Sequence, residues 1–224
     1  AQQRGRVTAV IGCRGAPGTT EVAVAYALSQ SRHEDVLLID LDLSAPSVAI
    51  RLGLPARPDL TDVAGAVRGG DGVSGENVQR FAGMAVVTGS HRTDEASLKQ
   101  SHIDAVVHSA SAEWSEIVLD LGADPVSFDR VADADASILV VEASAIGIVR
   151  AAQLVSDWVG PAPALVLNKV EPRAAAEMED AVRKWTGLDP ELSIPDRRKV
   201  RTASQAALRP DRRFSKSVAR LGHR

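Results

Sequence analysis

The sequence predicts an α/β fold, with a doubly wound, mainly parallel sheet and helices on both faces. Two observations carry this prediction. Short apolar runs alternate with helical segments along the chain, which is the order of elements in a parallel sheet covered by helices. Aromatic residues make up only 3% of a chain that is 45% hydrophobic. Ala, Val and Leu must therefore fill the core, as is typical of buried parallel strands.

Each expected element follows from its local pattern. The apolar run at residues 7–11 predicts the first strand, and residues 20–31, apolar nearly all round, predict a buried helix. The glycine-rich residues 68–77 are expected to form a loop within the domain. Further strands are predicted at residues 35–40, 84–89, 116–122, 136–143 and 163–170, and further helices at residues 61–67, 98–111, 146–159 and 174–185.

Length and composition limit the class of protein. A chain of 224 residues suits one domain with a substantial core, spanning residues 1–224. No run approaches twenty apolar residues, so no membrane span is expected. Cys13 is the only cysteine, which excludes an internal disulfide framework and favours a reducing, cytoplasmic location. The five histidines are scattered, and no Cys/His spacing indicates zinc.

The segment GCRGAPGTT, residues 12–20, joins the first strand to the first helix and resembles a phosphate-binding loop. Such loops surround an anion with backbone N–H groups and a helix start, while a lysine adds charge and a hydroxyl binds Mg²⁺. Gly15, Gly18 and Thr20 fit this chemistry. Against the pattern G-x-x-x-x-G-K-[ST], however, Cys13 replaces the first glycine and Thr19 the lysine. Judged alone, the segment fails this pattern, and a turn that merely resembles a phosphate loop is the alternative.

Polar residues follow several of the predicted strands. Asp40 and Asp42 come two apart at the end of the second run, Asp120 ends the fourth, and Asn168 ends the last. Ligands of doubly wound sheets bind beyond the carboxyl ends of the strands. Beside a Mg-nucleotide, one of the paired aspartates could hold a metal-bound water and the other could orient the attacking water. An Asp/Ser-rich turn capping the next helix is the structural alternative.

Five motifs in order resemble the MinD/ParA family of deviant-Walker P-loop ATPases, over residues 6–221. The family's strand, x-K-G-G-x-G-K-T-T loop and helix correspond to VTAVIGCRGAPGTTEVAVAYAL. Its D-x-D segment with an L-G-L ending corresponds to VLLIDLDLSAPSVAIRLGL, and its Walker-B and switch II region to EIVLDLGADP. ALVLNKVEP resembles the strand that ends in an asparagine near the adenine, and IPDRRKVRTASQ the Ile-Pro loop on the other side of the base.

The resemblance implies roles for single residues. Arg14 stands at the signature lysine that reaches the partner's phosphate in an ATP-sandwich dimer, and arginine could do this with a forked geometry. Thr19 stands at the lysine that holds the β- and γ-phosphates, whose charge threonine cannot replace. The implied nucleotide site comprises Arg14, Gly15, Ala16, Gly18, Thr19, Thr20, Asn168 and Pro195, the implied Mg²⁺ site Thr20, Asp40 and Asp120, and the implied catalytic carboxylates Asp40 and Asp42.

Loss of the loop lysine is similar to one branch of this family, which contains the CpaE/TadZ pilus-assembly proteins and related septum-site-determining proteins. Members often carry a receiver-like N-terminal domain, so the chain, which begins without Met, is expected to be an excised C-terminal domain. The Ala16-Pro17 pair departs even from this branch. The resemblance implies a spatial regulator that binds ATP or ADP with Mg²⁺, dimerises, recruits pilus or division proteins and hydrolyses ATP weakly or not at all. An active positioning ATPase and a nucleotide-free scaffold are the alternatives.

The C-terminal residues 196–224 are basic, with ten lysines and arginines against two aspartates. Because the whole chain carries a formal charge of −3, the first 195 residues carry −11. Phe214, Val218 and Leu221 have helical spacing. Such a helix could bind a membrane surface, which would place the protein at the membrane or cell pole, or nonspecific DNA. Since the resembled family has a final core helix here, packing against the domain is favoured.

Overall fold

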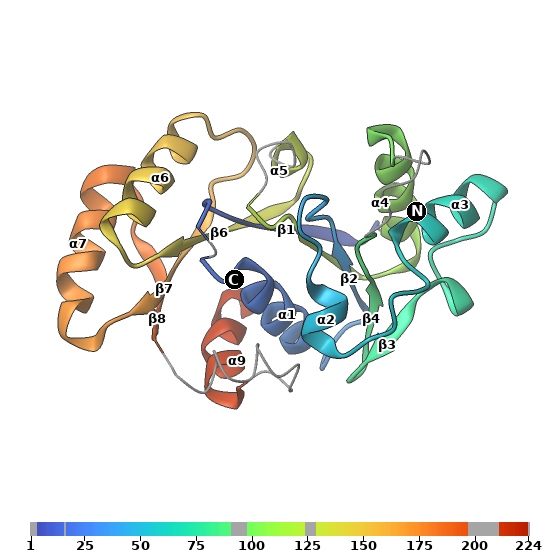
Figure 1. Ribbon diagram of the computed structural model, residues 1–224, viewed down its shortest axis with the longest axis horizontal. Helices are drawn as coiled ribbons and strands as arrows, with labels where there is room; N and C mark the ends of the chain where they lie inside the picture. The colour runs from blue at the N-terminus through green and yellow to red at the C-terminus, as the bar shows by residue number, and fades with distance from the viewer. Residues whose placement is uncertain (1–3, 16, 91–97, 124–128, 197–210, 224) are drawn as a thin grey trace.

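One eight-stranded sheet runs through the molecule in the order β3-β4-β2-β5-β1-β6-β7-β8 (Figure 1). The computed structural model describes residues 4–15, 17–90, 98–123, 129–196 and 211–223. Every neighbouring pair of strands is parallel except β3 and β4, which confirms the predicted fold class. The strands are β1 (Arg6–Gly12), β2 (Val36–Asp40), β3 (Gln79–Phe81), β4 (Met84–Val87), β5 (Glu116–Asp120), β6 (Ala136–Glu142), β7 (Ala164–Val170) and β8 (Pro190–Pro195).

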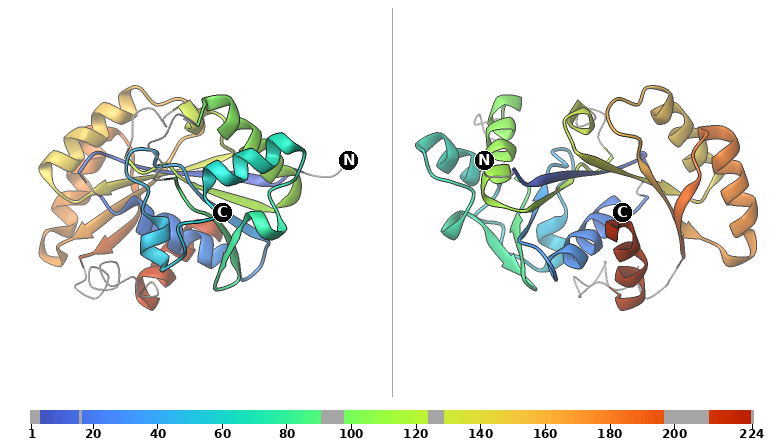
Figure 2. Two further views of the ribbon diagram at one scale, coloured as in Figure 1. Left: turned by 45° about the vertical axis from the view of Figure 1, so that its right-hand side comes forward. Right: turned by 180° about the vertical axis from the view of Figure 1, so that it is seen from behind.

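Helices cover both faces of this sheet (Figure 2). One face packs against α3 (Leu60–Gly69), α4 (Gln100–Glu113), α5 (Asp129–Ala132), α6 (Ala145–Ser156) and α7 (Ala175–Thr186). The other packs against α1 (Thr19–Gln30), α2 (Val48–Leu52) and α9 (Arg212–Val218). Three short 3₁₀ turns at Gly75–Asn77, Pro172–Ala174 and Ala219–His223 complete the described elements.

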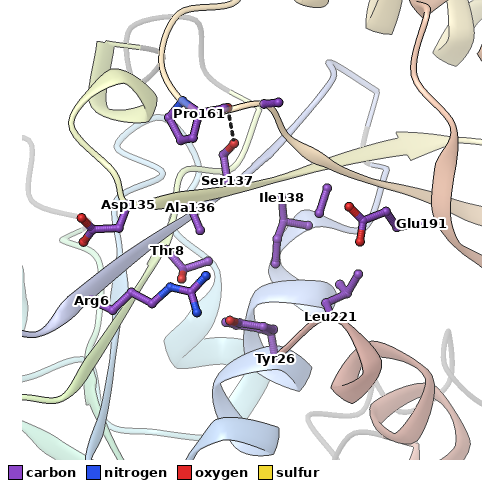
Figure 3. A pocket seen from close by; sticks show the side chains of 12 residues that line it. Arg6, Thr8, Tyr26, Asp135, Ala136, Ser137, Ile138, Pro161, Glu191 and Leu221 are labelled. Carbon is purple, nitrogen blue, oxygen red and sulfur yellow. Dashed lines mark hydrogen bonds between the residues drawn. The ribbon is translucent and has the colours of Figure 1, made fainter. Parts of the chain in front are cut away.

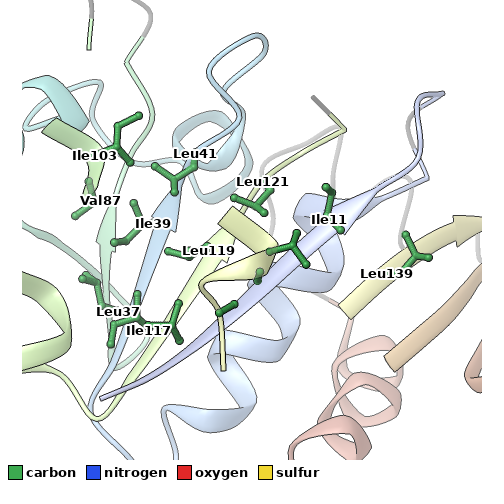
Figure 4. Close-up of a cluster of buried hydrophobic side chains, with 14 of the residues drawn as sticks. Ile11, Leu37, Ile39, Leu41, Val87, Ile103, Ile117, Leu119, Leu121 and Leu139 are labelled. Atoms are coloured by element: carbon green, nitrogen blue, oxygen red, sulfur yellow. The ribbon is translucent and has the colours of Figure 1, made fainter. Parts of the chain in front are cut away.

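Alternation along the central strands separates two hydrophobic clusters. In β2, Leu37 and Ile39 belong to the first cluster, whereas Val36 and Leu38 belong to the second. Successive side chains of a strand point to opposite faces, and both faces are buried here, so the strands read as continuous apolar runs. Figure 4 shows part of the first cluster, with strand side chains packed below Ile103 of α4.

The predicted strands and helices all occur, with shifted ends, but four short elements were missed. They are α2, α5, β3 and β8. The strand β3 has three residues and β8 begins and ends in proline. Both lie at the edges of the sheet, where proline and short strands are tolerated but leave little periodic signal. Residues 68–77 form the end of α3, a loop and one 3₁₀ turn.

The basic C-terminal segment packs on the domain through α9. Phe214 and Val218 are buried in the second cluster, against α1, which confirms the favoured expectation for this helix. None of the helices in the described part of the chain is long and apolar enough to cross a membrane.

Candidate functional site

The glycine-rich loop leaves the carboxyl end of β1, the strand between β5 and β6. Its first two residues donate backbone hydrogen bonds to the chain segments on both sides of β1. The Gly12 N–H donates to the carbonyl of Gly122 at 2.8 Å, and the Cys13 N–H donates to that of Val140 at 3.3 Å. Asp40 and Asp120 end the strands on one side of the loop, as predicted, and Asn168 lies in β7 on the other side.

The loop presents backbone donors at the start of α1. Gly15 and Gly18 have φ values of 109° and 94°, a conformation that glycine adopts readily. Among the described residues, the N–H groups of Gly15, Gly18, Thr19 and Thr20 have no protein acceptor. Unpaired N–H groups at a helix start form an anion site. Ala16, also predicted to contact nucleotide, lies outside the described residues.

Thr19, at the position of the expected lysine, turns its side chain into the protein. The residue is 5% exposed, and its hydroxyl lies so close to Gly12 that a Cβ at residue 12 would collide with it. The Thr19 Oγ1 has no hydrogen-bond partner in the described part of the chain. The side chain thus supplies no charge to the loop, and only the backbone of Thr19 is placed to contact a phosphate.

The Thr20 hydroxyl lies 3.0 Å from the hydroxyl of Ser47. Ser47 precedes α2, and its N–H donates to Asp40 at 3.0 Å. The sequence analysis missed Ser47, although a serine before the segment VAIRL is a recognisable signal for a helix start. The loop helix and the segment after Asp42 are therefore linked through two hydroxyl groups.

Asp40 and Asp120 lie side by side, because they are register partners on the adjacent strands β2 and β5. Both are fully buried. Asp40 accepts backbone hydrogen bonds from Asp42, Ser47 and Val48 at 3.0–3.2 Å. Burial raises the pKa of both carboxyl groups, and the charge of Asp40 raises the pKa of Asp120 further. Ionisation of both carboxyl groups would therefore require a nearby cation.

Asp120 is the less satisfied of the two. Its Oδ1 accepts the Gly122 N–H at 3.2 Å, but its Oδ2 is buried without a partner among the described residues. The Thr20 hydroxyl is close enough to lower the pKa of Asp120. A buried oxygen without a partner calls for an explanation, and a bound ion is one that fits an acid at this end of the sheet.

Asp42 shapes the turn that follows β2. Its Oδ1 accepts hydrogen bonds from the N–H and hydroxyl of Ser44 and from the N–H of Ala45, at 2.7–3.2 Å. Its carboxylate also lies over Gly122, where any Cβ would collide with it. The turn that was the structural alternative for the paired aspartates is therefore present, with Asp42 at the edge of the site and half-buried.

The remaining predicted residues surround the loop. Arg14 is exposed, and its carbonyl accepts a hydrogen bond from Arg150, a residue that sequence reasoning missed. Asn168, predicted to lie near adenine, donates its side-chain N–H to the carbonyl of Pro17 at 2.7 Å. Pro195 ends β8 beside Val170, and residues 197–205 of the predicted Ile-Pro loop lie outside the described residues.

The residues present fit Mg²⁺ bound together with a nucleotide. In the described part of the chain, no three His, Cys, Asp or Glu side chains form a cluster that could hold a metal alone. Mg²⁺ is commonly held by one or two carboxylates together with phosphate oxygens and water. Thr20, Asp40 and Asp120, with the unpartnered Oδ2 of Asp120, match that donor set.

A separate recess of about 180 Å³ lies at the other end of the strands, where β1, β6 and β7 begin (Figure 3). Arg6, Thr8 and Tyr26 line it from one side and Glu191 from another. Ligand pockets usually have about 300–1,000 Å³, and none of the predicted site residues lines this recess. The loop end of the sheet, where those residues gather, is therefore the candidate nucleotide site.

Neither a protein-family model nor a curated protein matches the sequence. Solved structures do match. A ParA family ATPase from Chlorobium tepidum TLS has a TM-score of 0.82 at 19% identity, with 99% of each chain covered. The septum site-determining protein MinD of Pyrococcus horikoshii OT3, complexed with Mg-ADP, has a TM-score of 0.66 at 16% identity, covering 97% of this chain and 94% of that one.

A third similar structure is the MinC:MinD cell division protein complex of Aquifex aeolicus. It has a TM-score of 0.74 at 15% identity and covers 98% of this chain and 96% of that one. Identities this low carry the fold and not the activity. Strand order, loop position and these similarities agree, and the chain therefore has the fold of the MinD/ParA P-loop ATPases.

Proposed function

We propose that this protein is a spatial regulator that binds ATP or ADP with Mg²⁺ at the loop end of its sheet and hydrolyses ATP weakly or not at all. The observation that carries the proposal is the unpartnered Oδ2 of Asp120. This oxygen is buried beside Asp40 and close to Thr20. The adjacent glycine-rich loop has N–H groups without an acceptor among the described residues.

The residues expected to bind Mg²⁺ are all present in the site. Thr20, Asp40 and Asp120 would hold Mg²⁺, and the metal when bound would neutralise phosphate charge. Asp40 is already fixed by three backbone N–H groups. The Thr20 hydroxyl would have to leave its contact with Ser47 to bind the metal.

The phosphate-binding loop lacks the lysine that would supply its positive charge. Phosphoryl transfer depends mostly on positioning and on stabilising charge as it develops. Thr19 provides no cation, and its hydroxyl is buried against Gly12. Backbone N–H groups can still hold phosphate. This combination supports nucleotide binding with a low rate of hydrolysis, and on this ground we propose the CpaE/TadZ-like branch and not that of the active ATPases.

Asp42 is the carboxylate we assign to orienting the attacking water. Its Oδ1 is engaged by Ser44 and Ala45, which holds the side chain at the edge of the site. A residue held in a turn can bind and orient a water without accepting its proton. This arrangement agrees with slow turnover.

A nucleotide-linked homodimer is the partner arrangement that we propose. Arg14 is exposed on the loop, and Leu43, Ile146 and Val149 are exposed on segments that follow the carboxyl ends of β2 and β6. Since one of the similar structures is a complex of MinD with MinC, a division or pilus-assembly protein is the further partner that we propose. Septum placement or pilus positioning at the membrane or cell pole would be the cellular role.

Calorimetric titration with ATP and ADP, with and without Mg²⁺, tests the proposal. We expect Mg-dependent binding with a micromolar Kd, weakened about tenfold by Thr20→Ala, because that variant removes a metal-binding hydroxyl. Thr186→Ala, at the end of α7, is the matched control and should bind like the wild type.

Two outcomes would replace the proposal. If a sample with a cooperative unfolding transition releases no heat of binding up to millimolar nucleotide, nucleotide binding is contradicted. The nucleotide-free scaffold would then be the better hypothesis. Rapid turnover abolished by Asp42→Ala would instead establish an active positioning ATPase.

A further inference from the structure

Two carbonyl groups of the loop are held by side chains from outside it. Arg150, on α6, donates from its Nη1 to the Arg14 carbonyl at 2.7 Å. Asn168, on β7, donates from its Nδ2 to the Pro17 carbonyl at 2.7 Å. The two donors come from different elements, far from the loop in sequence, so the loop shape is set by the tertiary structure.

Both contacts depend on glycine. A Cβ on Gly15 would come within 2.6 Å of the Arg150 Nη1, and a Cβ on Gly18 would come within 2.6 Å of the Asn168 Nδ2. Both glycines also have positive φ, which costs other residues strain. The loop has therefore kept two glycines that these donors require, while the lysine is absent.

Each contact fixes the direction of an N–H group. In a trans peptide the C=O and the following N–H point to opposite sides. Holding the Arg14 carbonyl from outside directs the Gly15 N–H the other way, and holding the Pro17 carbonyl does the same for the Gly18 N–H. Neither N–H has an acceptor within the described part of the chain. The two donors thus preset two of the groups that an anion would need.

Arg150 also brings a positive charge to the loop. Its charge lowers the pKa of the Cys13 thiol, against burial, which raises that pKa to about 11. Arg150 is exposed and lies on the carbonyl side of the Arg14–Gly15 peptide, so its charge reaches a ligand on the N–H side only at longer range, where salt will screen it.

We propose that Arg150 and Asn168 are positioning residues that hold the loop in its phosphate-binding shape, with the charge of Arg150 acting on the ligand at longer range from the carbonyl side of the loop. The inference rests on the proposed nucleotide site for its ligand, a nucleoside di- or triphosphate. It concerns the free protein as well, because both contacts exist without a ligand.

Arg150→Gln, Arg150→Lys and Asn168→Ala test the inference with two measurements. In the free protein, hydrogen–deuterium exchange of the peptide that spans Gly12 to Thr20 should be several-fold faster for Arg150→Gln and Asn168→Ala. Affinity for Mg-ATP should fall about tenfold in Arg150→Gln. Arg150→Lys should regain part of this affinity at low salt, because it keeps the charge, but should not regain the slow exchange.

Lys184→Gln is the matched control, since Lys184 is an exposed cation in the last turn of α7. It should change neither measurement. Arg150 is exposed, so Arg150→Gln is expected to fold and carries the test even if the buried Asn168 does not tolerate alanine. Wild-type exchange and wild-type affinity in Arg150→Gln would overturn the inference. If the wild type binds no nucleotide, the proposed function fails, and faster loop exchange in the variants would still support the positioning role.

Discussion

Strand β5 begins and ends in a buried acid, and its two ends differ in how that acid is satisfied. Glu116 starts the strand, is 3% exposed and accepts a hydrogen bond from the Thr8 hydroxyl at 2.6 Å. Asp120 ends the strand, is fully buried and leaves its Oδ2 without a partner among the described residues. Each acid accepts one hydrogen bond, but in the described part of the chain Asp120, unlike Glu116, also has a buried oxygen without a partner, which makes it the acid that a ligand could complete.

The surrounding charges follow the same division. Burial raises the pKa of both acids. Near Glu116, the charge of Arg6 lowers the pKa, whereas near Asp120 the largest charge effect comes from Asp40 and raises it. Glu34 and Asp135 also raise the pKa of Glu116, so both ends of the strand have acids nearby, but Arg6 offsets them at the amino end, whereas the charges that act on Asp120 are those of Asp40 and Asp42. We infer that the first arrangement is structural and the second functional.

Asp120→Asn is the variant for which we expect the largest effect. The amide has nearly the same shape but is a poor ligand for Mg²⁺, so we expect the affinity for Mg-nucleotide to fall about a hundredfold. The free protein should not lose stability, because burial and the charge of Asp40 raise the pKa of Asp120 to about 8, and the amide replaces a buried carboxyl group whose ionisation is unfavourable. Calorimetric titration and chemical denaturation measure the two effects.

Glu116→Gln is the control at the other end of the same strand, and it should leave nucleotide affinity unchanged. If Asp120→Asn bound Mg-nucleotide as tightly as the wild type, the carboxyl end would hold no metal. The unpartnered oxygen would then have no functional meaning.

The fold could be predicted because its central elements depend on local patterns. The runs VLLID and EIVLD each have a continuous apolar centre and end in aspartate, so strand type, burial and the position of both aspartates follow from the sequence alone. Thr20 could be placed for a similar reason, since a hydroxyl at the start of a helix after a glycine-rich loop fits the pattern of a phosphate-binding loop.

The contacts that complete the site could not be predicted. Arg150 lies 136 residues from Arg14, and Asn168 lies 151 residues from Pro17. No periodicity or spacing reports contacts across such distances. The inward direction of the Thr19 side chain was also hidden, because it depends on the space left beside Gly12. Loop residues are identified by sequence, but their supports are identified only by the packed structure.

A smaller effect is expected from the titration of Glu116, which should make the free energy of unfolding depend on pH. Its pKa is raised from 4.5 to about 7, chiefly by burial. Between these values the folded protein keeps a proton that the unfolded chain has lost, so the free energy of unfolding falls as pH rises. Allowing for partial solvent screening, we expect Glu116 to remove about 2 kcal/mol of stability between pH 4 and pH 8.

Urea denaturation of wild type and Glu116→Gln across this pH range measures that contribution. The wild type should lose more stability than the variant as pH rises, and the comparison cancels groups common to both proteins. Parallel pH profiles would mean that Glu116 titrates normally, and the two ends of β5 would then differ less than we infer.

The smallest expected effect comes from Thr8→Val, which removes the hydroxyl that donates to Glu116 without changing the volume of the side chain. Thr8 is 1% exposed, so water cannot easily replace its hydroxyl. We expect a loss of about 1 kcal/mol at pH 8, where Glu116 is charged, and a smaller loss at pH 5. In the Glu116→Gln background the same substitution should cost less, because no buried anion is left unpaired. An equal cost in both backgrounds would show that Thr8 stabilises the protein by packing alone, and that Glu116, like Asp120, lacks a protein partner of energetic consequence.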